Sequence, residues 1–266
     1  MAGPSLVDIG RDPRGVVTLT LNRPQRHNAL SGALIDALTA ALGRLREDAS
    51  VRVLVLAAAG ASFCAGADID EMRQAADTSP ADNEREAGRL AELLLQLDRF
   101  PRPTVARIQG NAFGGALGLI AACDVAIAAG DARFALSVDD VGIALAMFSA
   151  YLLRAIGPRQ ARRYFLTGER FDARTAERLG LLHLVAPAEG LDAAVAAVLA
   201  ELLRGAPGAQ AECKRLIGHV AGRSDAEDRA LAAETARWIA RLRAGDEGRE
   251  GLGAFLQRRP PGWSHD

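Results

Sequence analysis

Apolar residues recur along the first half of the chain with two different spacings. Val17, Leu19 and Leu21 alternate with Val16, Thr18 and Thr20, which predicts a strand that ends at Asn22-Arg23-Pro24. The next apolar positions follow the face of a helix capped by Ser31, and they are Leu34, Ile35, Leu38, Leu42 and Leu45. The continuous apolar run over 51–56 is typical of a strand buried on both faces.

The same alternation of strand and helix continues to about residue 136. A polar stretch over 75–83 is expected to be a surface excursion, and helical spacing resumes at Leu90 to Leu97. A helix of small residues is expected from the glycine-rich loop to Cys123, and further strands are expected over 104–108, 124–128 and 133–136. Strands and helices in alternation predict a layered α/β core.

Beyond Gly157 the chain is mostly helical. Asp172 and Gly180 bracket one helix, Pro207 starts another, and Ser224 with Glu227 forms the capping-box signature of a third. One stripe of this last helix carries Leu231, Thr235, Trp238 and Leu242. We expect that stripe to be buried, either on the core of the same chain or on another subunit.

The composition and net charge of the chain argue against some classes of function. The 266 residues are 49% hydrophobic and 24% charged, as in an ordinary globular protein. A net charge of −1, with basic residues spread along the chain, argues against a general nucleic-acid or membrane-surface binder. Lys214 is the only lysine, so phosphate on a ligand would be met mainly by arginine.

Cysteine usage and the N-terminal sequence bear on the compartment. Cys64, Cys123 and Cys213 are widely spaced and match no metal or redox motif, so we expect neither a disulfide framework nor a bound metal. The chain lacks a basic segment followed by an apolar run at its start, and it lacks an apolar stretch long enough for a membrane span. These features predict a soluble, cytoplasmic protein without a membrane partner.

Two loops of small residues carry the candidate chemistry. Residues 63–68 and 110–118 each follow a predicted strand and open a helix, and their small side chains allow a ligand to approach the main chain. A helix N-terminus has unpaired N–H groups and the positive end of the helix dipole. Two such ends that converge would stabilise a carbonyl oxygen that gains negative charge, and Ala67 and Gly115 are the candidate donors.

Small residues in these loops would also serve a purely structural purpose, since they permit tight turns and close packing of helix on strand. A glycine-rich loop can bind a nucleotide as well. However, Gly114-Gly115-Ala116-Leu117-Gly118 does not supply the spacing of a dinucleotide-binding loop, and the sequence has no Walker lysine. Both nucleotide-binding interpretations are therefore weak.

The motifs together resemble the crotonase superfamily of enoyl-CoA hydratases and isomerases. The resemblance rests on Asn22-Arg23-Pro24, Asn28-Ala29-Leu30 and the two loops, and it extends from about Gly15 to Arg259. Residues 161–167 and 179–183 look most like the branch of methylglutaconyl-CoA hydratases.

This resemblance implies a spiral of strand-strand-helix turns over residues 1–200 and a C-terminal helical oligomerisation region over 201–266. It implies a homotrimer or hexamer that acts on an acyl-CoA thioester without a further cofactor. By the resemblance Ala67 and Gly115 are the two oxyanion-hole amides. The coenzyme A path would be lined by Arg23, Arg26, Ala65, Asp68 and Ile69, and reached by Phe255 and Arg258 from the C-terminus.

The sequence lacks the two glutamates that are usual in hydratases of this family. Hydratases of the family usually have one glutamate shortly after the glycine loop and another about twenty residues later, and these positions here are Gly118 and Val138. Asp139 and Asp140 follow the second position, so a local shift would present one of them to the substrate. Alternatively, both aspartates are solvated or cap the next turn.

Three functions therefore stay open from sequence. The first is a hydratase or isomerase of 2-enoyl-CoA or a related thioester, in which Asp139 or Asp140 moves the proton. The second is a catalytically impaired acyl-CoA-binding paralogue. The third, a serine hydrolase, would need an exposed serine with histidine and aspartate partners, but the sequence has no G-x-S-x-G elbow. We favour the first, because both oxyanion loops are intact.

Overall fold

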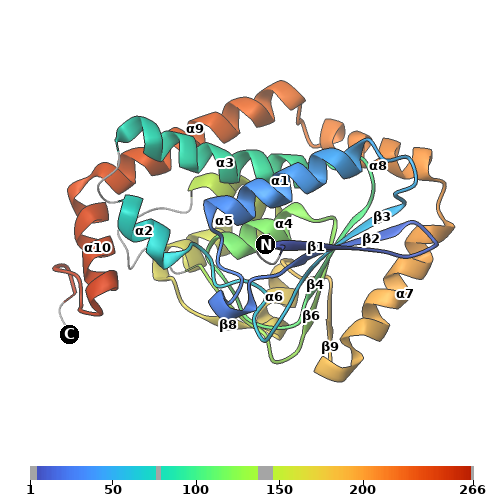
Figure 1. Ribbon diagram of the computed structural model, residues 1–266, viewed down its shortest axis with the longest axis horizontal. Coiled ribbons are helices and arrows are strands. Elements are labelled where there is room, and N and C mark those ends of the chain that lie inside the picture. Colours follow the sequence, from blue (N-terminus) through green and yellow to red (C-terminus); the bar gives the residue numbers. More distant parts are fainter. Residues whose placement is uncertain (1–4, 76–78, 137–145, 265–266) are drawn as a thin grey trace.

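The chain folds around a six-stranded sheet. The structure, a computed structural model, describes residues 5–75, 79–136 and 146–264 (Figure 1). The strand order is β1-β2-β3-β4-β6-β9, with β1 antiparallel to β2 and the other neighbours parallel. The strands are β1 (Val7–Arg11), β2 (Val16–Leu21), β3 (Val53–Ala58), β4 (Thr104–Ile108), β6 (Val125–Ala129) and β9 (Leu184–Ala186).

A second, smaller sheet lies beside the first. Its strands are β5 (Ala112–Phe113), β7 (Arg133–Ala135) and β8 (Phe171–Asp172). Parallel single-residue bridges from Leu30 to Ala67 and from Cys64 to Ala112 extend it towards the N-terminus. Successive turns of the chain thus add one segment to each sheet, which confirms the predicted α/β spiral.

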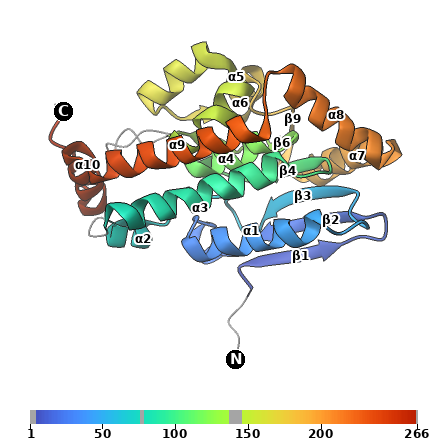
Figure 2. The ribbon, with the colours of Figure 1, turned by 90° about the horizontal axis from the view of Figure 1, so that it is seen from above.

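Helices cover both faces of the main sheet (Figures 1 and 2). Helices α1, α3 and α9 lie side by side, with α3 packed between the other two. The helices are α1 (Gly32–Arg46), α2 (Ile69–Ala75), α3 (Pro80–Asp98), α4 (Gly115–Ala122), α5 (Ala146–Thr167), α6 (Ala173–Leu179), α7 (Leu191–Arg204), α8 (Pro207–Val220), α9 (Asp225–Ala244) and α10 (Asp246–Gln257), with short 3₁₀ turns η1 (Pro24–Arg26) and η2 (Ala188–Gly190).

Burial on both faces explains the continuous apolar run in β3. Leu54 and Leu56 belong to the main core, whereas Val53 and Val55 on the opposite face belong to a second apolar cluster. Helix α7 covers this second cluster with Leu191, Val195 and Leu199. Side chains alternate across a strand, so a strand between two layers needs apolar residues at every position.

Most predicted elements are confirmed, together with their caps. The Ser31 hydroxyl accepts the Leu34 amide at the start of α1, Asp172 caps α6, and Ser224 with Glu227 forms the capping box of α9. The prediction of a surface excursion over 75–83 is wrong in its second half, because α3 begins at Pro80. The Ser79 hydroxyl caps this polar first turn.

The stripe predicted on α9 is only partly buried. Thr235 is buried, but Leu231 is 40% and Trp238 50% exposed. The residues that α9 buries on the rest of the chain include Ala236, Ile239 and Ala240. Burial of Leu231 and Trp238 on another subunit stays a prediction, as does the division at residue 200, which falls inside α7.

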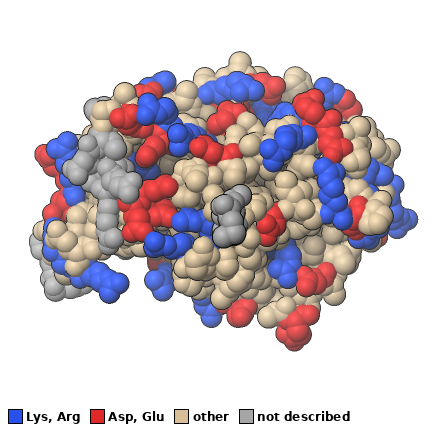
Figure 3. All heavy atoms as spheres, in the orientation of Figure 1, with Lys and Arg blue, Asp and Glu red and all other residues tan. Residues whose placement is uncertain are grey.

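Charge is mixed over the visible surface. Figure 3 shows acidic and basic side chains interspersed on one face, in line with the net charge of −1. In the described part of the chain, no helix is long and apolar enough to cross a membrane.

A cluster of charged side chains joins the C-terminal end of α3 to the first turn of α9. Buried Asp228 accepts hydrogen bonds from Arg223, at 2.6 Å, and from Arg99. Burial disfavours the charged form of Asp228, but these two guanidinium groups outweigh it and hold the pKa of Asp228 below its ordinary value. Asp98 at the end of α3 also pairs with Arg223, so the cluster fixes two helices together.

We expect Asp228→Asn to lower the free energy of unfolding by about 2 kcal/mol at pH 7, because two partly buried guanidinium groups each lose one of their carboxylate partners. The lowered pKa stabilises the fold above the pKa of unfolded aspartate, and this contribution disappears as the pH falls through the lower folded value. The deficit should therefore shrink below about pH 4 in urea titrations. The control is Asp225→Asn, since exposed Asp225 pairs with the same Arg99. An equal deficit at pH 7 and pH 3 would contradict the assignment.

Candidate active site

The two candidate loops are bound to each other through their main chains. The Phe63 amide donates to the Asn111 carbonyl at 3.0 Å, and the Phe113 amide donates to the Cys64 carbonyl at 3.0 Å. Both loops therefore belong to the second sheet, where Cys64 is bridged to Ala112. Their position side by side is a consequence of strand pairing.

Gly66 is the point of closest approach between the loops. Its φ of +90° lies in the left-handed region, and a Cβ atom at this position would stand 2.9 Å from the Phe113 carbonyl oxygen. The Gly66 carbonyl also accepts the Leu30 amide at 2.7 Å, which attaches a third segment to the pair. A side chain at Gly66 would thus force the loops apart.

The third segment is held by a buried asparagine. Asn28 has a φ of +54°, its side-chain oxygen accepts the Arg23 amide at 2.9 Å, and its amide group donates to the Ala59 and Ser62 carbonyls at 2.8 and 2.9 Å. Asparagine tolerates this left-handed conformation better than most residues. The Asn28-Ala29-Leu30 motif therefore supports the site from behind.

Ala67 and Gly115 both line one cavity of about 570 Å³. Gly115 is the first residue of α4, so its amide has no intrahelical acceptor. Within the described ranges, neither the Ala67 nor the Gly115 amide donates to another residue of the chain. Both N–H groups are therefore left for a ligand, and their convergence on a single ligand atom stays a prediction.

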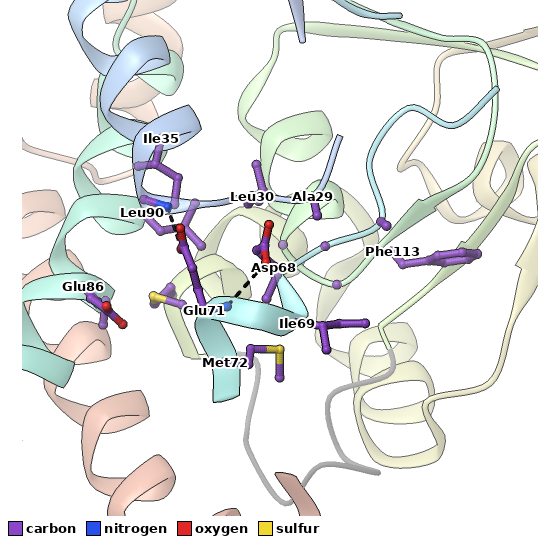
Figure 4. A pocket seen from close by; sticks show the side chains of 18 of the residues that line it. Ala29, Leu30, Ile35, Asp68, Ile69, Glu71, Met72, Glu86, Leu90 and Phe113 are labelled. Carbon is purple, nitrogen blue, oxygen red and sulfur yellow. Dashed lines mark hydrogen bonds between the residues drawn. The ribbon is translucent and has the colours of Figure 1, made fainter. Parts of the chain in front are cut away.

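The cavity wall around these donors is largely apolar. Side chains from α1, α3, α5, α9 and α10 contribute to it (Figure 4). They include Ile35, Leu90, Met147, Phe148, Ile239 and Leu252, and Leu30 adds to the wall from the segment before α1. Such a wall excludes water and strengthens the electrostatic effect of the two amides on a bound oxygen.

Five of the seven residues predicted to bind substrate line this cavity. They are Arg26, Ala65, Asp68, Ile69 and Phe255. Arg23 and Arg258 do not line it: Arg23 donates to the Ala29 carbonyl and to Asp68, and Arg258 ends α10 in a left-handed conformation. Asp139 and Asp140, together with Val138, lie outside the described residues.

Asp68 fixes the start of α2 at the edge of the cavity. Burial would raise the pKa of its carboxyl group, but the Arg23 guanidinium at 2.9 Å and the amides of Asp70 and Glu71 hold that pKa below its ordinary value. A carboxylate that is buried, paired and used as a helix cap stays ionised. Asp68 therefore positions the loop and is unsuited to proton transfer.

Several residues of the cavity do not belong to the predicted set of substrate-binding residues. Glu71 accepts the Gly32 amide at 2.7 Å and so caps α1 from the next helix (Figure 4). Glu86 and Arg243 come from α3 and α9, and Arg170 lies over the Phe113 ring. The only sequence signal for Glu86 is its position one turn before Leu90 on the same helix face.

Cys64 is a core residue. It is fully buried, and burial raises the pKa of its thiol to about 12. The reactive thiolate is therefore absent at neutral pH.

Packing closes the space beside Gly118, the residue that the family resemblance places where hydratases usually have their first glutamate. A Cβ atom on Gly118 would stand 2.6 Å from the Phe148 Cβ and 3.3 Å from Leu94 Cδ1. Phe148 comes from α5 and fills the space that a side chain on α4 would need. The packing of α4 against α5 therefore leaves no room for a glutamate side chain at position 118.

The structure contains a serine-histidine pair, but in the described part of the chain this pair lacks the carboxylate partner that a serine hydrolase needs. His27 Nδ1 lies 3.1 Å from the Ser62 hydroxyl, and His27 lines the cavity. A triad also requires a carboxylate on the second ring nitrogen, and no described carboxylate binds His27.

Comparison with known proteins decides the family. A family model described as enoyl-CoA hydratase/isomerase matches residues 11–266. The chain belongs to this family. The crotonase resemblance of the sequence is thereby confirmed, and with it the fold class.

Members of the enoyl-CoA hydratase/isomerase family similar to this chain differ in their named activities. A trans-2-decenoyl-acyl-carrier-protein isomerase of Streptococcus mutans is 31% identical over 93% of this chain and 94% of that protein. A mevalonyl-coenzyme A hydratase of Aspergillus fumigatus is 30% identical over 93% of this chain and 91% of that protein. The crystal structure of an enoyl-CoA hydratase from Mycobacterium avium has a TM-score of 0.84 and 38% identity, over 98% of this chain and all of that one.

We expect Gly66→Ala to cost about 1–3 kcal/mol of stability and to weaken binding of an acyl-CoA, because the new methyl group meets the Phe113 carbonyl and φ is positive. Chemical unfolding and calorimetric titration measure the two effects. Gly88→Ala on α3 is the control, since its Cβ meets no atom within 4 Å and alanine favours the helix. Unchanged stability and affinity in Gly66→Ala would show that the loops do not depend on this contact.

Proposed function

We propose that the protein converts a 2-enoyl-CoA or a related thioester, as hydratase or isomerase, through an enolate whose oxygen is bound by the Ala67 and Gly115 amides. One observation carries the proposal: Ala67, two residues before α2, and Gly115, the first residue of α4, line one apolar cavity, and neither amide has an acceptor in the described part of the chain. The oxygen of a thioester carbonyl becomes more negative when its α-carbon loses a proton, or when water adds to the β-carbon of a 2-enoyl thioester. Each preorganised donor is worth roughly 10²- to 10³-fold in rate.

Coenzyme A would enter past the residues at the mouth of the cavity. Arg26, Ala65 and Ile69 are exposed and line it, and exposed Phe255 lines it from the C-terminal helix. Arg23 would act indirectly, by holding Asp68 and the loop between them. Arg258 ends the same helix as Phe255, where a basic group suits a phosphate.

The proton donor is the open part of this proposal. The Gly118 position is closed by Phe148. Asp139 and Asp140 are the candidates, because they follow the second family position in sequence. A positioned acid contributes roughly 10²- to 10⁴-fold.

The second candidate function is acyl-CoA binding without turnover. The packing at Gly118 favours it, since restoration of an acid there would need two helices to move. In this case the amides would hold the thioester carbonyl without proton transfer.

Assembly into a homotrimer or hexamer belongs to the same proposal. Leu216, Ile217 and Val220 form an exposed apolar face on α8, and Trp238 is half exposed on α9. Side chains of this kind, gathered on C-terminal helices, support burial against other copies of the chain.

The deciding experiment combines turnover with isotope exchange. We expect 2-enoyl-CoA thioesters to be hydrated or their 3-enoyl isomers to be shifted, and the rate to fall about 10²-fold or more in Asp139→Asn or Asp140→Asn. Asp131→Asn is the control, because Asp131 is an exposed aspartate in the turn before β7. Binding of saturated acyl-CoA without turnover, and without deuterium uptake at its α-carbon in heavy water, would favour the binding protein instead.

We expect Gly118→Glu to give no gain in hydration and to lower stability by about 2 kcal/mol, since its Cβ would overlap Phe148. Unfolding and turnover of the variant measure both effects. The matched control is Gly43→Glu, at an exposed position of α1 where a Cβ meets nothing within 4 Å. A stable and faster Gly118→Glu enzyme would contradict this account of the site.

A further inference from the structure

Three of the described residues contribute a carboxylate to the wall of the cavity. They are Asp68, Glu71 and Glu86. Asp68 is buried, paired with Arg23 and used as the cap of α2, so it stays ionised and is unsuited to proton transfer. Glu86 lies on α3, where its charge acts on the guanidinium of Arg243. Glu71 is the carboxylate that is left to act on a ligand.

Glu71 is held at one of its two carboxylate oxygens. Its Oε2 accepts the Gly32 amide at 2.7 Å, at the N-terminus of α1. A helix N-terminus offers unpaired N–H groups to an acceptor of this kind. Within the described part of the chain, Oε1 accepts no hydrogen bond and the side chain forms no ion pair. The second oxygen is therefore available to a ligand in the cavity.

The carboxylate of Glu71 lies near both candidate amides. Leu30 forms a parallel bridge with Ala67, and its Cδ1 would stand 3.1 Å from a Cβ atom on Gly115. Leu30 is therefore beside both amides. Gly32, which binds the carboxylate, follows Leu30 by two residues, and two residues of chain span at most about 7 Å. Figure 4 shows the Glu71 side chain directed from α2 towards the start of α1.

We propose that Glu71 is a catalytic base, which takes a proton from the α-carbon of the bound thioester and later returns it. This inference rests on the proposed function and names one of its proton-transfer groups. In the step, the C–H bond breaks and its electron pair forms a double bond between the α-carbon and the carbonyl carbon. The carbonyl π electrons move to the oxygen that the two amides bind. The α-carbon is two bonds from that oxygen, which brings it within reach of a carboxylate near the amides.

This assignment divides the proton transfers between two groups. Return of the proton to the γ-carbon completes the isomerisation of a 3-enoyl thioester, and that reaction needs no second base. In hydration, a second group must take a proton from the water that adds to the β-carbon. Asp139 and Asp140 stay the candidates for that group. Glu71 thus adds a carboxylate from α2 to a cavity in which α4 has no room for one at position 118.

The test follows deuterium uptake at the α-carbon of butanoyl-CoA in heavy water, with the full chain. Butanoyl-CoA has no double bond in its acyl chain, so its exchange reports the base without hydration or isomerisation. We expect exchange in the wild type and a loss of about 10²-fold or more in Glu71→Gln. The glutamine carbonyl retains an acceptor for the Gly32 amide, so calorimetric titration should give an unchanged affinity for butanoyl-CoA.

The matched control is Glu47→Gln. It makes the same substitution at the exposed C-terminal end of α1, outside the cavity, and should exchange like the wild type. An equal loss of exchange and of affinity in Glu71→Gln would overturn the assignment, because it would indicate a structural role alone.

Exchange that persists in Glu71→Gln would overturn the assignment and leave the proposed function intact. Its disappearance in Glu86→Gln, Asp139→Asn or Asp140→Asn would then identify the base. A wild-type protein with neither exchange nor turnover would overturn the two proposals together.

Discussion

The main-chain hydrogen bonds between residues 63–64 and 111–113 are the constraint on which the site depends. They make two loops, nearly fifty residues apart, into neighbouring strands of one small sheet. Gly66 has no side chain and therefore lets the two loops approach each other closely. The Leu30 amide binds the Gly66 carbonyl and so attaches a third segment to the loops. Ala67 and Gly115 are then presented by a backbone framework, which is more rigid than a pair of side chains would be.

In the proposed function, this framework would separate polarisation of the thioester from proton transfer. The amides come from the sheet and from the first turn of α4, whereas the acid usual in the family would come from further along that helix. Phe148 fills the space beside Gly118, where the family resemblance would place that acid. The fold can therefore keep one half of its chemistry while the other half changes, in agreement with the different activities named for its relatives.

Local patterns are sufficient to predict much of the fold and the two loops of small residues that line the cavity. The cap at Ser31, the capping box at Ser224 and the small residues around Ala67 and Gly115 are short-range signals, and the structure contains the corresponding elements. Contacts between distant segments cannot be predicted in this way. Phe148 lies thirty residues from Gly118, and Arg243 meets the cavity only because α9 packs on α3. The family resemblance makes Arg23 a ligand contact, whereas its side chain is engaged with Asp68 and Ala29.

The charged cluster around Asp228 has a consequence for the distant end of the same helices. Helices α3 and α9 run side by side, joined at one end by Asp98, Asp228 and their arginines, and they carry Glu86 and Arg243 at the other. About 22 Å of helix separates Asp228 from Arg243. The ion pairs thus hold α3 and α9 together at the end that is distant from the cavity. A shift of α9 along α3 would move Ile239 and Arg243 relative to Leu90, and would therefore change the shape of the cavity that Ala67 and Gly115 also line.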